Sequence, residues 1–283
     1  MAEILKGGPV AKALTERLAA EAQALRENGI SPTLAILRIG ERPDDIAYEN
    51  AAIKRCEKAG VDVKLFTLPR DAGPDDVLDA VEDINSDYGI NGCLMMRPLE
   101  DKSMENAACL LLRSEKDVDC MTPGSLAGVF SGSGEGFAPC TAQAVIELLN
   151  FYGIPLKGKR VCVLGRSLVI GKPLAMLMLA EDATVTVCHS KTEKLADICR
   201  EADVLVAAVG RAEFVDASFV REGQVVVDVG INVREDGSLC GDVDFASVEP
   251  VVAAITPVPL GVGSVTTAVL AKHVVEAAKN SMR

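Results

Sequence analysis

The chain has 283 residues, enough for two domains of ordinary size, and 49% of them are hydrophobic, so buried aliphatic cores are expected. The formal net charge of −12 excludes the basic footprint of a nucleic-acid-binding protein. No apolar run approaches the ~20 residues of a membrane span, and the N-terminus lacks the pattern of a signal peptide. We therefore expect a cytoplasmic protein without nucleic-acid or membrane partners.

The cysteines and histidines form no pattern typical of a metal site. Nine cysteines are scattered without a C-x-x-C pair, and the two histidines are His189 and His273. An odd number of scattered cysteines indicates small buried apolar residues in a reducing compartment, not disulfides. We expect no bound metal.

The first half of the chain alternates predicted helices and strands. In order, we expect a helix over 10–28, a strand over 33–39, a helix that Asp44 or Asp45 caps and that ends at Ala59 before Gly60, a strand over 61–68, a helix over 75–86, a strand over 90–96 and a helix over 104–113. This alternation implies a parallel sheet with right-handed crossovers. Residues 123–136 are rich in glycine and serine, so we expect a loop there.

The second half repeats the alternation. We expect a helix over 140–151, strands over 161–164, 185–188, 204–209, 225–229 and 252–255, and a final helix over 265–280 that returns to the first domain. The fold class is therefore α/β, with two α/β domains. The first covers 1–138 and is completed by 265–283, and the second, 139–264, is doubly wound and Rossmann-type. Because ligands of such sheets bind beyond the carboxyl ends of the strands, we expect a deep cleft between the domains.

Residues 160–179 predict a strand, a glycine turn and a helix. The turn holds Gly165, Arg166 and Ser167, and helical spacing begins near Gly171. Such a unit presents backbone N–H groups and a positive helix end to a phosphate. Ser167 stands where the usual dinucleotide fingerprint has its middle glycine, so the local pattern alone leaves an ordinary strand-to-helix turn equally open.

The end of the next predicted strand bears on which dinucleotide binds. Sites that prefer NAD often place an acidic residue there, beside the adenosine ribose. This chain has Ser190 and Lys191 instead, and a hydroxyl with a cation suits a 2′-phosphate. We predict NADP over NAD; the alternative is that Lys191 is only a solvated surface residue.

Seven motifs in this order and spacing resemble the methylenetetrahydrofolate dehydrogenase/cyclohydrolase family over essentially the whole chain. They are Lys116–Asp119, Pro139–Thr141, 165–173, 184–192, 225–232, 241–245 and 256–268. The resemblance implies a homodimer active in one-carbon metabolism, with a folate-binding first domain and an NADP-binding second domain. The family oxidises 5,10-methylenetetrahydrofolate to the methenyl form and then hydrolyses that product to 10-formyltetrahydrofolate.

The resemblance also implies roles for individual residues. The expected cofactor contacts are Gly165, Arg166, Ser167, Ser190 and Ile231, and the expected folate contacts are Tyr48, Asp119, Leu260, Gly261 and Gly263. Asp119 should hold the pterin ring, since a carboxylate accepts two donors at once; its alternative role is a capping or turn aspartate. Tyr48 should line and orient the folate ring. The loop at 259–264 reads PLGVGS where the family usually has PGGVGP.

Two residues that the family associates with the hydrolytic step are replaced in this chain. Ala52 stands where the family has a lysine, four residues after Tyr48, and Met96 stands where it has a glutamine. Lys54 is no substitute, because residues six apart lie about 240° apart around a helix and residues four apart only about 40°. We therefore predict a methylenetetrahydrofolate dehydrogenase with weak or absent cyclohydrolase activity.

Three other interpretations of the sequence stay open. One is a fully bifunctional dehydrogenase/cyclohydrolase. A second is a different NADP oxidoreductase, such as a shikimate-type dehydrogenase, which would need a lysine–aspartate acid/base pair that we do not find. The third is a folate or nucleotide sensor without catalysis, against which the retained cofactor motifs argue.

Overall fold

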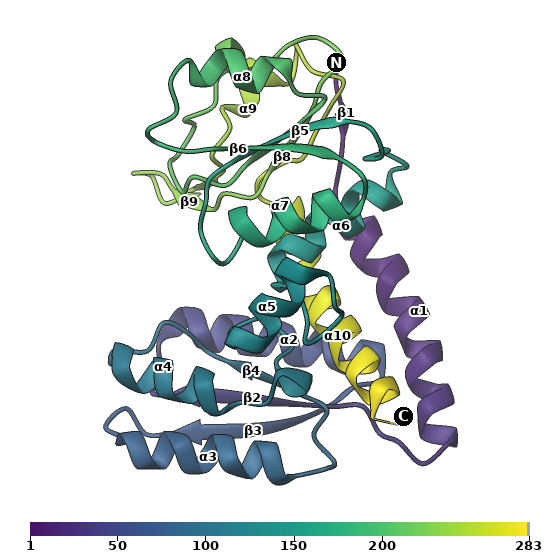
Figure 1. Ribbon diagram of the computed structural model, residues 1–283, viewed down its shortest axis with the longest axis vertical. Helices are drawn as coiled ribbons and strands as arrows, with labels where there is room; N and C mark the ends of the chain where they lie inside the picture. Colours follow the sequence, from purple (N-terminus) through teal and green to yellow (C-terminus); the bar gives the residue numbers. More distant parts are fainter. Residues whose placement is uncertain (282–283) are drawn as a thin grey trace. The chain divides into compact units, whose positions relative to one another are not determined.

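The computed structural model describes residues 1–281, which divide into two compact units (Figure 1). One unit contains residues 1–11 and 141–266, and the other contains residues 12–140 and 267–281. The expected end of the first domain, residue 283, lies outside the described residues. We expected residues 1–11 in the first domain, whereas β1 (Glu3–Ile4) pairs with β11 (Ala254–Ile255) in the other unit.

The unit of residues 12–140 is built on a three-stranded parallel sheet. Its order is β3 (Asp62–Leu68), β2 (Thr33–Ile39), β4 (Gly92–Met95). The central strand β2 is buried from its first residue to Arg38, as a strand covered on both faces requires. The helices of this part of the chain are α1 (Gly7–Glu27), α2 (Pro43–Ala59), α3 (Pro74–Ser86), α4 (Lys102–Leu111), α5 (Pro123–Ser131) and α10 (Thr266–Asn280).

The prediction that Asp44 or Asp45 caps α2 was wrong. The N-cap position is Arg42, which makes no side-chain cap, and Pro43 occupies the first turn. Asp45 instead accepts two hydrogen bonds from the Arg42 guanidinium, at 2.7 and 3.0 Å. The helix ends at Gly60, whose φ of 73° is the left-handed conformation expected of a glycine stop.

The prediction of a loop over 123–136 was also wrong, since α5 occupies most of that segment. Thr122 caps the helix by accepting from the N–H of Ser125 at 3.1 Å, and Pro123 begins it. A Cβ at Gly128 would overlap the carbonyl oxygen of Glu135. The glycines that indicated a loop therefore allow the chain after α5 to pack directly against it.

The last helix, α10, contacts the unit of residues 12–140 along its length. Lys279 forms an ion pair with Glu21 at 2.6 Å, and Arg55 reaches Thr267 at 3.4 Å. Within residues 1–281, no helix combines the length and apolar content needed to cross a bilayer.

The other unit is built on a six-stranded sheet in which every pairing is parallel. The strand order is β1, β11, β8 (Val225–Asp228), β7 (Val204–Ala207), β5 (Arg160–Leu164), β6 (Thr184–Cys188). The chain order reverses at β5, so the crevice between β5 and β7 is the topological switch point where such sheets bind ligands. A short hairpin, β9 (Asn232–Val233) and β10 (Leu239–Cys240), was not predicted. The helices here are α6 (Cys140–Phe151), α7 (Gly171–Ala180), α8 (Leu195–Glu201) and α9 (Phe245–Val248).

Candidate functional site

The turn after β5 brings three segments into close contact. Gly165 has a φ of 128°, and a Cβ there would overlap the carbonyl oxygen of Ala208, just beyond β7. A Cβ at Gly171 would overlap the carbonyl oxygen of Gly165, so the first residue of α7 also has to be glycine. The two glycines join strand end and helix start as phosphate-binding turns do.

Arg166 and Ser167 occupy the exposed part of this turn. The Ser167 hydroxyl accepts a hydrogen bond from the N–H of Ile170 at 3.1 Å, which stabilises the approach to α7. The positive end of α7 and the Arg166 guanidinium are therefore available to an anion.

The residues after β6 lie at the same edge of the sheet, because β5 and β6 are paired in parallel register to their last residues. The N–H of His189 donates to the Thr192 hydroxyl at 2.9 Å and closes a tight turn. The turn exposes Ser190 and Lys191, the predicted 2′-phosphate contacts.

The buried carboxylate of Asp242 holds two loops at this edge. Its oxygens accept hydrogen bonds from the N–H groups of Val209, Gly210 and Arg211 at 2.6 to 2.9 Å. They also accept from the Asn232 side chain at 2.9 Å. Asp242 thus fixes the chain after β7 against the chain after β8. We did not predict this role, because the GDVDF motif at 241–245 served only as part of the family resemblance.

Asp228, at the end of β8, is a second buried carboxylate that organises the same loops. It accepts from the N–H groups of Gly230, Asp242 and Val243 at 2.9 to 3.0 Å. The pKa of Asp228 is raised to about 6, mainly by burial and to a smaller extent by the nearby Asp242 charge, while these hydrogen bonds oppose the rise.

The raised pKa of Asp228 predicts how stability depends on pH. The folded protein binds the Asp228 proton more tightly than the unfolded chain, whose aspartate pKa is about 3.9. The contribution of Asp228 to the free energy of unfolding is therefore fully present below about pH 4 and falls by about 3 kcal/mol as the pH rises through 6. Urea unfolding of the wild type and Asp228→Asn at pH 4.5 and 7 measures this. The account fails if the difference between the two proteins does not change with pH.

A pocket of about 220 Å³ is lined by residues for which we predicted different ligands, the cofactor and the folate. Ile231, a predicted cofactor contact, lines it together with Leu260, Gly261 and Gly263, which were predicted to wall the folate site. The Ile231 side chain is exposed, and a Cβ at Gly263 would lie 3.6 Å from its Cδ1. The structure thus places residues that we expected to contact two different ligands around one pocket of the same unit.

The 259–264 loop keeps a glycine-like conformation despite its departure from the usual family sequence. Leu260 has a φ of 80°, which costs a non-glycine residue on the order of 1 kcal/mol. Its carbonyl oxygen accepts from the N–H of Gly7 at 2.8 Å, and a Cβ at Gly7 would overlap the carbonyl oxygen of Gly261. The N-terminal segment thus braces this loop.

Asp119, in the other unit, is half-buried at the start of α6. Its Oδ1 accepts from the N–H of Cys140 at 2.9 Å, so the carboxylate does serve as a helix-end acceptor. Burial raises the pKa of Asp119, while the Cys140 hydrogen bonds and the charge of Arg97 oppose the rise. Asp119 is thus a half-buried carboxylate with a raised pKa, and the charge of Arg97 acts on it.

The backbone beside Asp119 is anchored by α10. The carbonyl oxygen of Val118 lies 2.9 Å from Nδ1 of His273 and 3.3 Å from Sγ of Cys140. Because a carbonyl only accepts, His273 carries its proton on Nδ1. The Phe137 ring stacks on His273 with centroids 4.9 Å apart. Apart from the apolar face of the last helix, no sequence pattern indicated this anchor.

Tyr48 is half-buried on α2. The two positions at which the family has a lysine and a glutamine carry buried apolar side chains in this chain. Ala52 is 0% exposed and belongs to the buried stripe of the helix, and Met96 is 5% exposed. Lys54 is exposed, as the helical spacing predicts.

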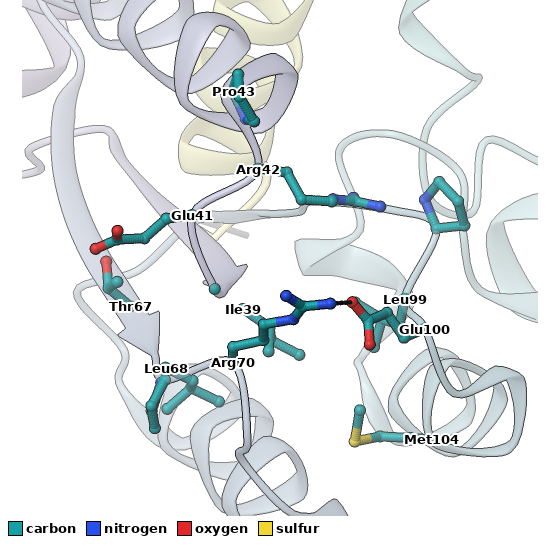
Figure 2. A pocket seen from close by; sticks show the side chains of 13 residues that line it. Ile39, Glu41, Arg42, Pro43, Thr67, Leu68, Arg70, Leu99, Glu100 and Met104 are labelled. Carbon is teal, nitrogen blue, oxygen red and sulfur yellow. Dashed lines mark hydrogen bonds and ion pairs between the residues drawn. The ribbon is translucent and has the colours of Figure 1, made fainter.

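A pocket of about 910 Å³ lies at the carboxyl ends of β2, β3 and β4 (Figure 2). It is lined by Ile39, Gly40, Glu41, Arg42, Pro43, Thr67, Leu68, Pro69, Arg70, Pro98, Leu99, Glu100 and Met104. Neither Tyr48 nor Asp119 is among its lining residues. An ion pair between Arg70 and Glu100, at 2.9 Å, joins two of its walls.

A parallel sheet with a glycine turn and a helix at its switch point defines a dinucleotide-binding α/β protein. Comparison with known proteins identifies the family within this class. Residues 5–119 match the catalytic domain, and residues 139–282 the NAD(P)-binding domain, of tetrahydrofolate dehydrogenase/cyclohydrolase. The chain therefore belongs to the tetrahydrofolate dehydrogenase/cyclohydrolase family, which confirms the resemblance and argues against a shikimate-type enzyme.

The relatives match this chain over its whole length. A bifunctional protein FolD of Clostridioides difficile is 50% identical over 277 residues, which cover 98% of this chain and 96% of the relative. The crystal structure of a FolD enzyme from Campylobacter jejuni is 35% identical with a TM-score of 0.94, covering 99% of both chains. The FolD of Trypanosoma brucei, complexed with NADP cofactor and an inhibitor, is 34% identical with a TM-score of 0.91, covering 100% of this chain and 99% of that one.

Proposed function

We propose that the protein oxidises 5,10-methylenetetrahydrofolate to the 5,10-methenyl form with NADP⁺, and that its cyclohydrolase activity is weak or absent. The main support for the dehydrogenase activity is the 220 Å³ pocket, which is lined by both Ile231 and the 259–264 loop. Family relatives are named as enzymes of this reaction, and one of them is complexed with NADP.

The chain's residues fit the cofactor that the family implies. The Gly165 turn has no room for a Cβ and precedes the positive end of α7, which suits the diphosphate. Ser190 and Lys191 would hold the 2′-phosphate, and Ile231 would pack beside the nicotinamide. When bound, NADP⁺ supplies the hydride acceptor.

The folate side would be held by Asp119 and Tyr48. A carboxylate facing the amino-pyrimidine edge of the pterin would form charge-assisted hydrogen bonds, which are stronger than hydrogen bonds between neutral groups. Tyr48 would line the ring. As hydride leaves the methylene carbon, the lone pair of a neighbouring folate nitrogen forms the cation, so no side-chain base is needed. The protein's contribution is positioning.

The hydrolytic step differs because it needs water activation and proton transfer, work that suits a lysine of lowered pKa. Ala52 and Met96 leave two buried apolar side chains where the family has that lysine and its supporting glutamine. Lys54 is exposed on another face of α2. These observations support a dehydrogenase that releases the methenyl product.

We expect the purified protein to reduce NADP⁺ with methylenetetrahydrofolate. We expect it to hydrolyse methenyltetrahydrofolate no faster than the spontaneous reaction does. Decay of the methenyl absorbance with and without protein measures this, and Lys54→Ala is the matched variant. Rapid hydrolysis that Lys54→Ala abolishes would overturn the argument from the helix face and favour the fully bifunctional enzyme.

We also propose a cytoplasmic homodimer. The nine cysteines are all free, as expected in a reducing compartment. β6 is an edge strand with exposed Thr186 and Val187, and such edges are usually covered. Sedimentation equilibrium tests the dimer.

A further inference from the structure

A buried ion pair joins the central strand of the three-stranded sheet to α2, and hydride transfer as described above does not use it. Nε of Arg38, near the end of β2, donates to Oε2 of Glu49 on α2 at 2.9 Å. Both residues are buried. Nη1 of the same guanidinium donates to the carbonyl oxygen of Gly40, in the segment between β2 and α2. Arg38 therefore ties together a strand end, a connecting segment and a helix.

The ion pair and Met96 lie on the same face of the sheet. The core on the opposite face, shared with α3 and α4, takes alternate residues of β2 and β4 and includes Leu37 and Met95. The N–H of Met96 donates to the carbonyl oxygen of Leu37 at 2.9 Å, so the pairing of β4 with β2 continues through this residue. Arg38 and Met96, each one position further along, therefore point to the face that α2 covers.

The buried stripe of α2 is charged in its first half and apolar in its second. Asp45 and Glu49 occupy the first half, and Ala52, Cys56 and Ala59 follow at helical spacing. Burial of apolar side chains is non-directional, whereas a hydrogen-bonded ion pair has a defined geometry. The bond from β2 to Glu49 therefore fixes the rotation of the first half of α2 about its own axis.

The contribution of this ion pair is orientation more than stability. Taking two charges out of water costs free energy that their attraction recovers only in part, and apolar side chains of similar size often stabilise a fold equally well. Tyr48 precedes Glu49 by one residue, so the two side chains leave α2 about 100° apart. With Glu49 held on β2, Tyr48 is held at the border of the buried stripe, where it is half-buried.

We propose that Arg38 and Glu49 are positioning residues for the dehydrogenase, which hold Tyr48 at the angle at which it orients the folate ring. The proposal rests on the proposed function, because it concerns the same substrate. Ala52 and Met96 leave no polar side chain at the two positions where the family has its lysine and glutamine. The ion pair supplies polar fixation on the same face of the sheet, and it acts on the substrate through α2.

Replacing both charges separates positioning from stability. In the double variant Arg38→Met/Glu49→Leu, the urea midpoint should stay at or above that of the wild type. Its kcat for methylenetetrahydrofolate should fall about tenfold, because a displaced ring costs rate in the hydride-transfer step, and the KM for NADP⁺ should not change. Arg26→Met/Asp62→Leu is the matched control, since that ion pair, at 2.7 Å, joins α1 to the start of β3 in the same unit.

Two single variants keep the proposal testable if the double variant does not fold. Glu49→Gln retains an oxygen for the hydrogen bond from Nε, so its kcat should stay within about twofold of the wild type. Arg38→Lys loses the planar fork that joins Glu49 to the Gly40 carbonyl oxygen, so its kcat should fall about three- to fivefold. Equal kcat in Arg38→Lys and the wild type would overturn the proposal.

A spectroscopic measurement reports the orientation of Tyr48 without any folate chemistry. The chain has three tyrosines, Tyr48, Tyr88 and Tyr152, so ¹⁹F NMR of protein containing fluorotyrosine shows one resonance for each, and Tyr48→Phe identifies the one of interest. The double variant at Arg38 and Glu49 should move the Tyr48 resonance and leave the other two in place. The control double variant should leave the Tyr48 resonance where it is in the wild type.

The two measurements together separate this proposal from the proposed function. An unmoved Tyr48 resonance and an unchanged kcat in the double variant would overturn the positioning role and leave the dehydrogenase intact. If the wild type does not turn over methylenetetrahydrofolate, the proposed function fails, and the resonance still decides whether the ion pair orients Tyr48.

Discussion

Asp119→Ala should lower kcat/KM for methylenetetrahydrofolate at least about a hundredfold, because it removes the charged acceptor proposed to hold the pterin. That factor corresponds to about 3 kcal/mol of transition-state stabilisation. The measurement is initial-rate kinetics with saturating NADP⁺. Asp119→Asn is the matched variant, because it keeps an oxygen for the Cys140 N–H but loses the charge.

Tyr48→Phe provides the contrast within the same site. The phenol has an unperturbed pKa near ~10, so a role in lining and orienting the ring is favoured over proton donation. The variant should keep substantial dehydrogenase activity. A loss as severe as that of Asp119→Ala would contradict the assignment of both residues and would require a proton donor in the dehydrogenase step.

Gly165→Ala should weaken NADP⁺ binding by at least about a hundredfold. The new Cβ would overlap the carbonyl oxygen of Ala208, and the φ of 128° is one that alanine rarely adopts. Fluorescence titration with NADP⁺ measures the affinity, and thermal unfolding monitors stability. Gly8→Ala is the control, because Gly8 lies in α1 with no atom within 4 Å of its added Cβ.

A second variant keeps this prediction testable if Gly165→Ala does not fold. Arg166→Gln changes only an exposed side chain of the turn and should leave thermal unfolding unchanged. It should still reduce affinity for NADP⁺, because it removes a cation beside the diphosphate. Unaltered cofactor affinity in both variants would place the nucleotide elsewhere.

The regular elements could be predicted because their local signals are strong. β2 reads TLAILRI and α6 reads CTAQAVIELLNF, and both have the predicted bounds. The failures have tertiary causes. The glycines of residues 123–136 indicated a loop, whereas Gly128 permits close packing of a helix. β1 is two residues long, and its register depends on β11, far away in the chain.

The candidate site likewise has some parts that could be predicted from the sequence and others that could not. The glycine turn could be located from its local pattern of strand, glycine and helix, although that pattern left an ordinary turn equally open. The 259–264 loop was assigned to the folate through the family resemblance alone. The roles of Asp228 and Asp242 could not be predicted, because their hydrogen-bond partners lie on separate loops that only the folded sheet brings together. The ion pair between Arg70 and Glu100 was not predicted for the same reason, since the two residues follow different strands.

The most direct test is NADP⁺ reduction with methylenetetrahydrofolate, followed by absorbance at saturating folate and compared with NAD⁺. We expect rapid reduction with NADP⁺, a clear preference over NAD⁺ and accumulation of the methenyl product. If neither nucleotide is reduced although folate and NADP⁺ both bind, the protein is a sensor and the hydride-transfer account is wrong.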